Sequence, residues 1–324
     1  MKKIKYSLIG CGNVAGGYKI KQKVDGVYSH LDALSRFKIF EPLACFDSNY
    51  KKALKFKKKW RFEYCSDNIN FLNKLNSEFI LVSSDTSSHF NILNKILKIR
   101  NKPKIVLCEK PLTINMKQCL QIYNNFNKEK IVLAVNFQRR WDETTQKIQK
   151  NIKNNSYGKF RVGYCIYNKG VLNTCSHAID LINFFFHKIK IINVGKRIYD
   201  YNKFDPSVPF IVKIKNRNIN FLCSDNRDSN MLEIKLIFSK KIIETYDGGI
   251  SWMVKDNKDK NILSYDFSFF DNRKYFLKKT YKYTFLNLFE NIFNFIKYKS
   301  KILCTGKEAL VVHKIVEKIL SNAK

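Results

Sequence analysis

Residues 4–16 read IKYSLIGCGNVAG, a short apolar run that ends directly in a glycine-rich turn. The run at 4–9 predicts a buried strand. In the turn, Gly10 permits a tight change of direction, Gly12 lets the backbone approach a pyrophosphate, and the small side chain of Ala15 allows a helix to pack closely on the strand. Backbone amides and the helix dipole then face the phosphates. The candidate dinucleotide-binding residues of this turn are Gly10, Gly12, Asn13, Val14 and Ala15.

Strands and helices alternate through the first part of the chain. Four more short apolar runs follow the first, and between them apolar residues recur at the three- and four-residue spacing of helices. Such alternation indicates a parallel, doubly wound sheet of the Rossmann type. The expected strands are 42–46, 79–83, 105–107 and 131–135, and the expected helices are 49–59, 89–100 and 115–126.

The pattern changes after residue 150, where strands follow one another without helices between them. This order indicates a mostly antiparallel sheet. The expected elements are strands at 160–167, 189–199, 209–214, 219–223, 231–238 and 241–246, and helices at 176–186, 284–298 and 307–320. Since 324 residues exceed what one core usually organises, we expect an α/β protein of two domains. The first is a Rossmann domain over residues 1–122, and the second is an α/β domain with an open, mostly antiparallel sheet over residues 123–324.

Asp47 ends the second expected strand, where a carboxylate can accept hydrogen bonds from both hydroxyls of an adenosine ribose and repel a 2′-phosphate. This position favours NAD. Its separation from Gly12 exceeds the usual value of about 20 residues, which predicts a loop insertion within 16–30. Ser48, Lys51 and Lys52 would tolerate a 2′-phosphate, so NADP stays an alternative. Asp47 is also compatible with an ordinary helix cap.

Lys110 lies in the segment Cys108-Glu109-Lys110-Pro111, directly after the strand expected at 105–107. Ligands of open α/β sheets bind outside the carboxyl ends of the strands, so Lys110 would project into the cofactor crevice. Its ammonium donors suit a substrate hydroxyl whose carbon must be positioned against the nicotinamide. A surface lysine is the alternative in a lysine-rich chain, but the Glu-Lys-Pro context after a strand favours a site.

The charge balance is strongly basic, with 60 Lys and Arg against 27 Asp and Glu and a formal net charge of +33. Such a charge suggests a nucleic-acid partner. Most of these residues are Lys, accompanied by abundant Asn, Ile, Phe and Tyr, a mixture that an AT-rich genome would produce. Recognition of phosphates and bases by planar, bidentate contacts would favour Arg. We therefore interpret the charge as a basic surface and expect no nucleic-acid partner.

The cysteines and histidines give no sign of a disulfide framework or a metal site. Nine Cys form no CxxC pair, and the five His are scattered without an HxH or HxxxH pair. We expect reduced thiols in the cytoplasm and no metal. No apolar run reaches the roughly 18 residues of a membrane span, and the N-terminus lacks the pattern of a secretory signal. We therefore expect no membrane association.

These features occur together with further segments in a specific order, and the chain resembles the Gfo/Idh/MocA family of nicotinamide-dependent sugar and polyol oxidoreductases over nearly its whole length. The segments that carry the resemblance are Gly10-x-Gly12-x-x-Ala15, Asp47 at a strand end, Ser83-Ser84-Asp85-Thr86-Ser87-Ser88-His89, Glu109-Lys110-Pro111, Asn136-Phe137-Gln138-Arg139-Arg140 and Ser176-His177-Ala178-Ile179-Asp180.

The resemblance implies roles for individual residues. Lys110 matches the catalytic lysine of the family, and His177 matches its catalytic histidine at the start of a helix that lines the substrate site. Arg139 and Arg140 match a segment that borders the substrate pocket, although either is equally compatible with a structural ion pair. The second domain would bind the substrate, and its open sheet would form the interface of a homo-oligomer. Further cofactor-binding residues would be Ser48, Ser84, Glu109 and Lys110.

One departure from the family pattern concerns the position four residues before the histidine. Many members carry Asp there, whereas this chain has Asn173. An amide can orient a hydroxyl but cannot accept a proton as a carboxylate does. Either His177 works without that carboxylate, or the activity differs from that of the polyol dehydrogenases. Asp180 lies on a neighbouring helical face, where it would orient the imidazole or make a buried structural hydrogen bond.

The expected function is a hydride transfer between nicotinamide and a hydroxyl or ketone of a sugar or nucleotide sugar, in surface-glycan biosynthesis. Asn173 and Asp180 would then contact the substrate together with Arg139 and Arg140. A catalytically silent regulator or assembly subunit of the same fold is the alternative, and Asn173 is the feature in its favour. His30 and His89 fall at positions near the cofactor crevice, but packing of helices is the expected role of both.

Overall fold

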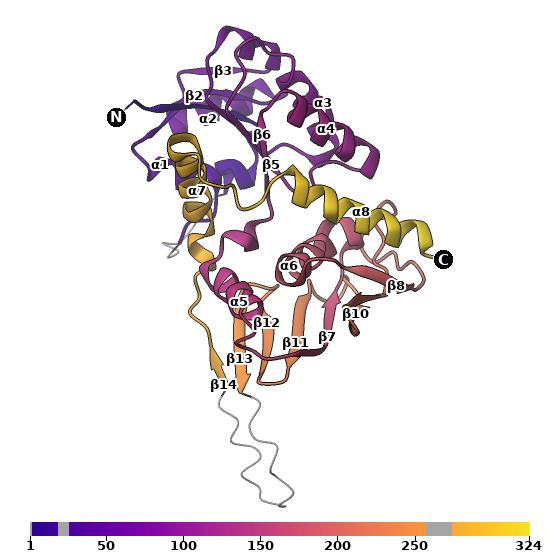
Figure 1. Cartoon of the computed structure of the whole chain (residues 1–324). Helices are drawn as coiled ribbons and strands as arrows, with labels where there is room; N and C mark the ends of the chain where they lie inside the picture. The colour runs from indigo at the N-terminus through magenta and orange to yellow at the C-terminus, as the bar shows by residue number, and fades with distance from the viewer. Residues whose placement is uncertain (1, 19–25, 257–273) are drawn as a thin grey trace, which may run out of the picture. The chain divides into compact units, whose positions relative to one another are not determined.

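The computed structural model describes residues 2–18, 26–256 and 274–324, which form two compact units (Figure 1). The first unit comprises Met1–Trp141 and Lys282–His313, and the second comprises Asp142–Tyr281 and Lys314–Lys324. Both units thus include a segment from the C-terminal part of the chain. These ranges differ from the domain bounds expected at 1–122 and 123–324, because long-range contacts join 123–141 and 282–313 to the first unit.

The first unit contains a six-stranded parallel sheet in the order β3-β2-β1-β4-β5-β6. This order is that of the doubly wound dinucleotide-binding fold, with its reversal between β1 and β4. The prediction of a Rossmann sheet is therefore confirmed. The strands are β1 (Ile4–Ile9), β2 (Phe40–Phe46), β3 (Tyr64–Ser66), β4 (Phe79–Val82), β5 (Ile105–Glu109) and β6 (Val132–Asn136).

Helices connect these strands and begin at side chains that satisfy their free amides. Asn49 accepts a hydrogen bond from the amide of Lys52, Asn115 from that of Gln118, and Ser29 from that of Asp32. The helices of the first unit are α1 (His30–Ser35), α2 (Tyr50–Trp60), α3 (Thr86–Ile96), α4 (Met116–Lys128) and α7 (Thr284–Tyr298). Helix α7 packs against α1, so a segment from the end of the chain completes the first unit.

The second unit contains an eight-stranded sheet in the order β14-β13-β12-β11-β7-β10-β9-β8. All neighbours pair antiparallel except β7 and β10, which run parallel. The mostly antiparallel second sheet is thus confirmed. Its strands are β7 (Phe160–Tyr167), β8 (Lys190–Val194), β9 (Phe210–Ile214), β10 (Arg217–Cys223), β11 (Leu232–Phe238), β12 (Lys241–Tyr246), β13 (Ser251–Asp256) and β14 (Lys274–Phe276).

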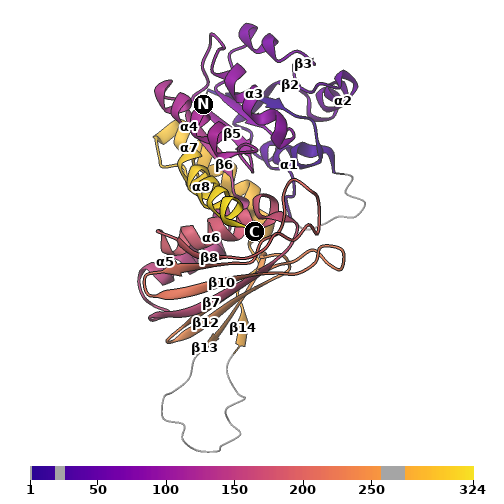
Figure 2. The ribbon, with the colours of Figure 1, turned by 90° about the vertical axis from the view of Figure 1, so that its right-hand side faces the viewer.

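Two helices, α5 (Glu143–Lys153) and α6 (Ser176–Phe186), lie on one face of this second sheet (Figure 2). The alternation of buried and half-buried residues along β11 shows that the covered face forms the core and the other face is more open. Helix α8 (Gly306–Asn322) ends the chain. Within the described residues, no helix combines the length and apolarity that crossing a membrane requires.

Candidate functional site

The glycine turn after β1 is held by the end of β4. Gly10 has φ +94°, and a Cβ there would lie 2.5 Å from the amide nitrogen of Ser84, so both the backbone conformation and the space require glycine. The Ser83 hydroxyl donates to the Gly10 carbonyl at 3.0 Å. The turn therefore sits at the reversal of strand order between β1 and β4, where ligands of such sheets bind.

The second glycine of the turn faces open space. Among the described residues, its two chain neighbours aside, no atom lies within 4 Å of the position that a Cβ on Gly12 would occupy. Packing inside the protein thus gives no reason for glycine here, whereas close approach of a dinucleotide pyrophosphate does. Ala15 is buried, and Asn13 and Val14 are exposed in the short helical turn η1 (Asn13–Gly17). The residues present fit a dinucleotide. Residues 19–25 of the loop insertion expected at 16–30 lie outside the described residues.

Asp47 follows β2, and its carboxylate is held by two backbone amides. The amide of Cys11 donates to one oxygen at 2.9 Å, and the amide of Asn49 donates to the other at 2.9 Å. A carboxylate offers about four acceptor sites, so this arrangement fixes Asp47 and leaves capacity for ribose hydroxyls. Ser48, Lys51 and Lys52 follow as exposed residues.

Lys110 follows β5 and is half-buried. The neighbouring Glu109 accepts hydrogen bonds from His30 Nε2 at 2.6 Å and from Asn136 Nδ2 at 2.7 Å. Burial acts to raise the pKa of Glu109, but the bonds from His30 and Asn136 and the charge of Lys110 outweigh it and hold the pKa below its ordinary value. An ionised carboxylate therefore supports the backbone beside Lys110.

The two histidines for which packing was expected also make specific polar contacts. His30 is fully buried with its ring against Phe285 and Phe289, in addition to its contact with Glu109. His89 is fully buried, with Nε2 at 2.9 Å from the Ser84 carbonyl oxygen and Nδ1 at 3.0 Å from the Pro111 carbonyl oxygen. Carbonyl oxygens only accept, so both contacts are hydrogen bonds only when the ring is doubly protonated. His89 links the loops that follow β4 and β5.

Arg139 and Arg140 follow β6 in the short turn η3 (Gln138–Trp141). Arg140 is buried and Arg139 is half-buried. Ser84, Lys110 and these arginines thus follow β4, β5 and β6 at the carboxyl edge of the same sheet as Gly12 and Asp47. The structure brings the predicted residues of the first unit to one edge.

The second unit contains the other predicted residues around the start of α6. His177 is the second residue of α6, and Asn173 lies in the preceding turn η4 (Gly170–Cys175); both are half-buried. Asp180 is buried one turn later. The sequence did not point to Asp205, whose two carboxylate oxygens accept hydrogen bonds from the amides of Leu172 and Asn173 at 2.8 Å each.

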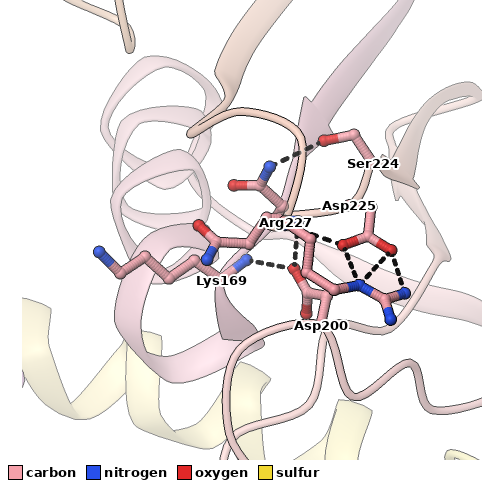
Figure 3. Close-up of polar contacts among 7 residues, drawn as sticks. Lys169, Asp200, Ser224, Asp225 and Arg227 are labelled. Carbon is pink, nitrogen blue, oxygen red and sulfur yellow. Dashed lines mark hydrogen bonds and ion pairs between the residues drawn. The ribbon is translucent and has the colours of Figure 1, made fainter.

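A second carboxylate fixes the beginning of this turn. Asp200 accepts hydrogen bonds from the amide of Lys169 at 2.8 Å and from the amide of Asn226 at 3.2 Å (Figure 3). Beside it, Asp225 and Arg227 form an exposed ion pair. Two buried or half-buried aspartates therefore hold the backbone that leads to His177. No motif signals either one, because each lies about thirty residues along the chain from the amides it binds.

All nine cysteines fall within the described residues, and each is a free thiol. Among the residues that the structure describes, no three His, Cys, Asp or Glu side chains come together in a way that could hold a metal ion.

Comparison with known proteins shows what the first unit is similar to. The Gfo/Idh/MocA family model, described as an oxidoreductase family with an NAD-binding Rossmann fold, matches residues 4–137. Residues 4–137 are thus similar to the NAD-binding Rossmann domain of this oxidoreductase family. The myo-inositol 2-dehydrogenase of Thermotoga maritima is 30% identical over 84 residues, which make up 26% of this chain. The matched part spans only 24% of the length of that relative.

Two solved structures share the fold over almost the whole chain. The WlbA dehydrogenase of Bordetella pertussis, solved in complex with NADH and UDP-GlcNAcA, has a TM-score of 0.78 at 14% identity, over 99% of this chain and 96% of that one. A super-repressor mutant of Gal80p from Saccharomyces cerevisiae also has a TM-score of 0.78, at 13% identity and with the same coverage of both chains. Identities this low establish the shared fold alone.

Proposed function

We propose that this protein is an NAD(P)-dependent oxidoreductase that acts on a CH–OH group of a sugar or nucleotide sugar in surface-glycan biosynthesis. The observation that carries the proposal is the position of Lys110 at the carboxyl edge of the sheet that also presents Gly12 and Asp47. A lysine there can hold a substrate hydroxyl beside a bound dinucleotide. The free thiols of all nine cysteines support a cytoplasmic location.

The residues of this chain divide the work of binding and proton transfer. The amide of Gly10 donates to the Phe46 carbonyl oxygen at 2.8 Å, so Gly10 would serve the cofactor by forming the turn. The amides of Gly12, Asn13, Val14 and Ala15 would hold the pyrophosphate, and Asp47 and Ser48 would hold the ribose. Ser84 and Glu109 would border the cofactor. The bound nicotinamide supplies a hydride acceptor or donor.

The substrate would be held by cations and an acid–base pair. Lys110 would orient the reacting hydroxyl, and His177 would exchange its proton. Arg139 and Arg140 would favour an anionic substrate such as a nucleotide sugar, and Asn173 and Asp180 would orient its hydroxyls. The nucleotide-sugar complex of WlbA supports this substrate class.

The first experiment is a thermal-shift screen against NAD, NADP and a panel of nucleotide sugars, because a ligand that binds only the native state raises its melting temperature. Sugars that give a shift are then assayed for turnover with the preferred cofactor. We expect cofactor-dependent oxidation or reduction of at least one of them. Absence of turnover with every sugar that binds would contradict an enzymatic role.

The second candidate is a catalytically silent regulator or assembly subunit of the same fold. Asn173 favours it, because an amide cannot replace a carboxylate in proton exchange. The fold shared with the repressor Gal80p is compatible with this role. The regulator would be favoured if the protein binds the cofactor without turnover and Lys110→Met binds the cofactor with the same affinity as the wild type.

A further inference from the structure

A pocket of about 640 Å³ lies in the second unit, at the opposite end of α6 from His177. Its lining includes Phe185 and Phe186 at the end of α6 and the first residues of β7 and β10, which pair side by side (Figure 2). The part of α6 from His177 to Phe186 separates the pocket from His177 by roughly 13 Å, at about 1.5 Å per residue. A volume of this size is in the range of small-molecule sites. The pocket is therefore separate from the proposed catalytic site.

The floor of the pocket is aromatic. The ring centroid of Phe160 lies 4.8 Å from that of Phe186 and 5.5 Å from that of Phe238, and the rings of Phe186 and Phe238 are nearly parallel at 6.2 Å. Phe238 is buried, whereas Phe160 and Phe186 are only half-buried. The two half-buried rings leave apolar surface that a ligand can cover.

The rim of the pocket is cationic. Ile219 of β10 pairs with Gly163 of β7 in parallel register, so Arg217 and Arg161, two residues earlier on each strand, stand next to each other. Arg217 occupies the row that continues into the buried Ile219, so its side chain projects toward the covered face of the sheet. Arg161 is the extra residue at an irregularity of β7, between Phe160 and Val162, and lines the same pocket. Both arginines are exposed at the mouth of the pocket. Two guanidinium groups on adjacent strands repel each other unless an anion lies between them.

The neighbouring residues strengthen this charge. Lys153, Lys159 and Lys215 also line the pocket, and no Asp or Glu is among its described lining residues. Arg217 pairs with Ile214 across the two-residue turn Lys215-Asn216, in which Lys215 has φ +53°. This tight hairpin fixes the first residue of β10. Arginine is scarce in this lysine-rich chain, and its planar fork suits phosphate or carboxylate better than lysine does.

We propose that this pocket binds a small amphipathic anion, with a phosphate or carboxylate held between Arg161 and Arg217 and an aromatic or short apolar group on Phe160 and Phe186. The ligand is a soluble metabolite of this chemical class. The site does not depend on cofactor binding or turnover in the first unit.

Calorimetric titration with phenyl phosphate, inorganic phosphate and phenol tests the proposal on the full chain. Phenyl phosphate should bind with one site per chain and more tightly than either fragment. Arg161→Gln and Arg217→Gln should each weaken its binding about 10-fold to 100-fold, as expected for loss of a charge-assisted hydrogen bond. Phe186→Ala should weaken phenyl phosphate but not inorganic phosphate.

The matched control is Lys213→Gln, which removes one positive charge from an exposed position of neighbouring β9 on the other face of the sheet. It should leave the affinity for phenyl phosphate within about twofold. Without ligand, Arg161→Gln and Arg217→Gln should melt at or above the wild-type temperature, because the repulsion is removed. If either fails to fold, Arg217→Lys keeps the charge without the fork and should bind with intermediate affinity.

Three results would overturn the proposal. The first is equal binding of phenyl phosphate by wild type and both Arg→Gln variants. The second is inorganic phosphate binding as tightly as phenyl phosphate, which would leave an ion site without an apolar subsite. The third is arginine-dependent sedimentation of the protein with phosphatidic acid vesicles, which would place the anion on a lipid instead of a soluble ligand.

Discussion

The carboxylate of Asp47 accepts a 2.9 Å hydrogen bond from the amide of Cys11, so the acidic end of β2 is fixed against the glycine turn that follows β1. The bond from the amide of Asn49 holds the other oxygen. A carboxylate held in this way is preorganised for two ribose hydroxyls and repels a phosphate at the same place.

We therefore predict that the protein binds NAD(H) in preference to NADP(H), and that Asp47→Asn loses about tenfold or more of this preference. Titration of protein fluorescence with both cofactors measures it. Asp67→Asn removes the same charge from an exposed position of the first unit and should keep the preference. Equal affinity of the wild type for both cofactors would remove Asp47 from this role.

Lys110 and His177 should act on the transition state more than on cofactor binding. Lys110→Met and His177→Asn should each lower kcat with little change in NAD affinity, and by about 10²–10⁴-fold for His177→Asn. Because Asn173 cannot ionise, a single histidine-like ionisation should govern turnover near neutral pH. The corresponding change of kcat with pH should disappear in His177→Asn.

Steady-state kinetics across pH, with the sugar that the binding screen identifies, provide the measurement. Lys117→Met changes an exposed lysine of α4 and serves as the control. Near-wild-type turnover in both Lys110→Met and His177→Asn would show that neither residue carries the chemistry.

Much of the fold follows from local sequence patterns. Strands β1, β7 and β12 and helices α6 and α7 have the predicted bounds, because each is a periodic apolar run that stops at a polar or glycine-rich turn.

Elements without such a pattern were missed. The three residues of β3 (Tyr64–Ser66) include none that is fully buried, so they carry no apolar signal. Helix α5 buries Thr144 and Thr145 beside Ile148, and threonine does not register as part of an apolar face. Strand β13 was not predicted either, although four of its residues are buried. It pairs with β12, the last strand that the sequence predicted.

The residues of the candidate site also fall into a predicted group and a group that the sequence did not indicate. Residues within local motifs, such as Gly12 and Lys110, were predicted because their chemistry depends on neighbours in the sequence. Asp205 was not, since it acts on the backbone of Leu172 and Asn173 from a distant loop, and only tertiary structure brings these groups together.

We expect His313 to cause a specific loss of stability in acid. It is buried in α8, and burial lowers its pKa from the ordinary value of 6.5 to about 4. Between these values the unfolded chain binds the proton more readily than the folded one, so the contribution of His313 to stability is present above pH 6.5 and is lost as the pH falls toward 4. The full loss is about 3 kcal/mol at 1.36 kcal/mol per pKa unit.

Urea denaturation at pH 7.5 and at pH 4.5 should show a smaller acid-induced loss of unfolding free energy in His313→Phe than in the wild type. Each protein is compared with itself at the two pH values. A loss of unfolding free energy that a packing defect of the variant causes at both pH values therefore cancels. His187→Gln, at an exposed histidine, should behave as the wild type. An identical acid loss in all three proteins would show that His313 is not the group responsible.

The outer face of the second sheet predicts a homo-oligomer. Ile237 of β11 pairs with Val162 of β7 on one side and with Ile242 of β12 on the other, so three apolar residues lie in a row on the face opposite α5 and α6. Val162 is 40% exposed. Farther along the same face, Leu222 of β10 pairs with Ile166 of β7 and is 47% exposed. A continuous apolar row of this kind on an open face is typical of a surface that a second copy of the chain covers.

Light scattering at micromolar concentration should give a mass that is a multiple of 38.3 kDa. Val162→Asp and Ile237→Asp should lower it to that of the monomer, because each would bury an unpaired charge. Leu120→Asp, at a 40% exposed position of α4 in the first unit, should leave the assembly intact. A wild-type protein that stays monomeric at this concentration would contradict the prediction.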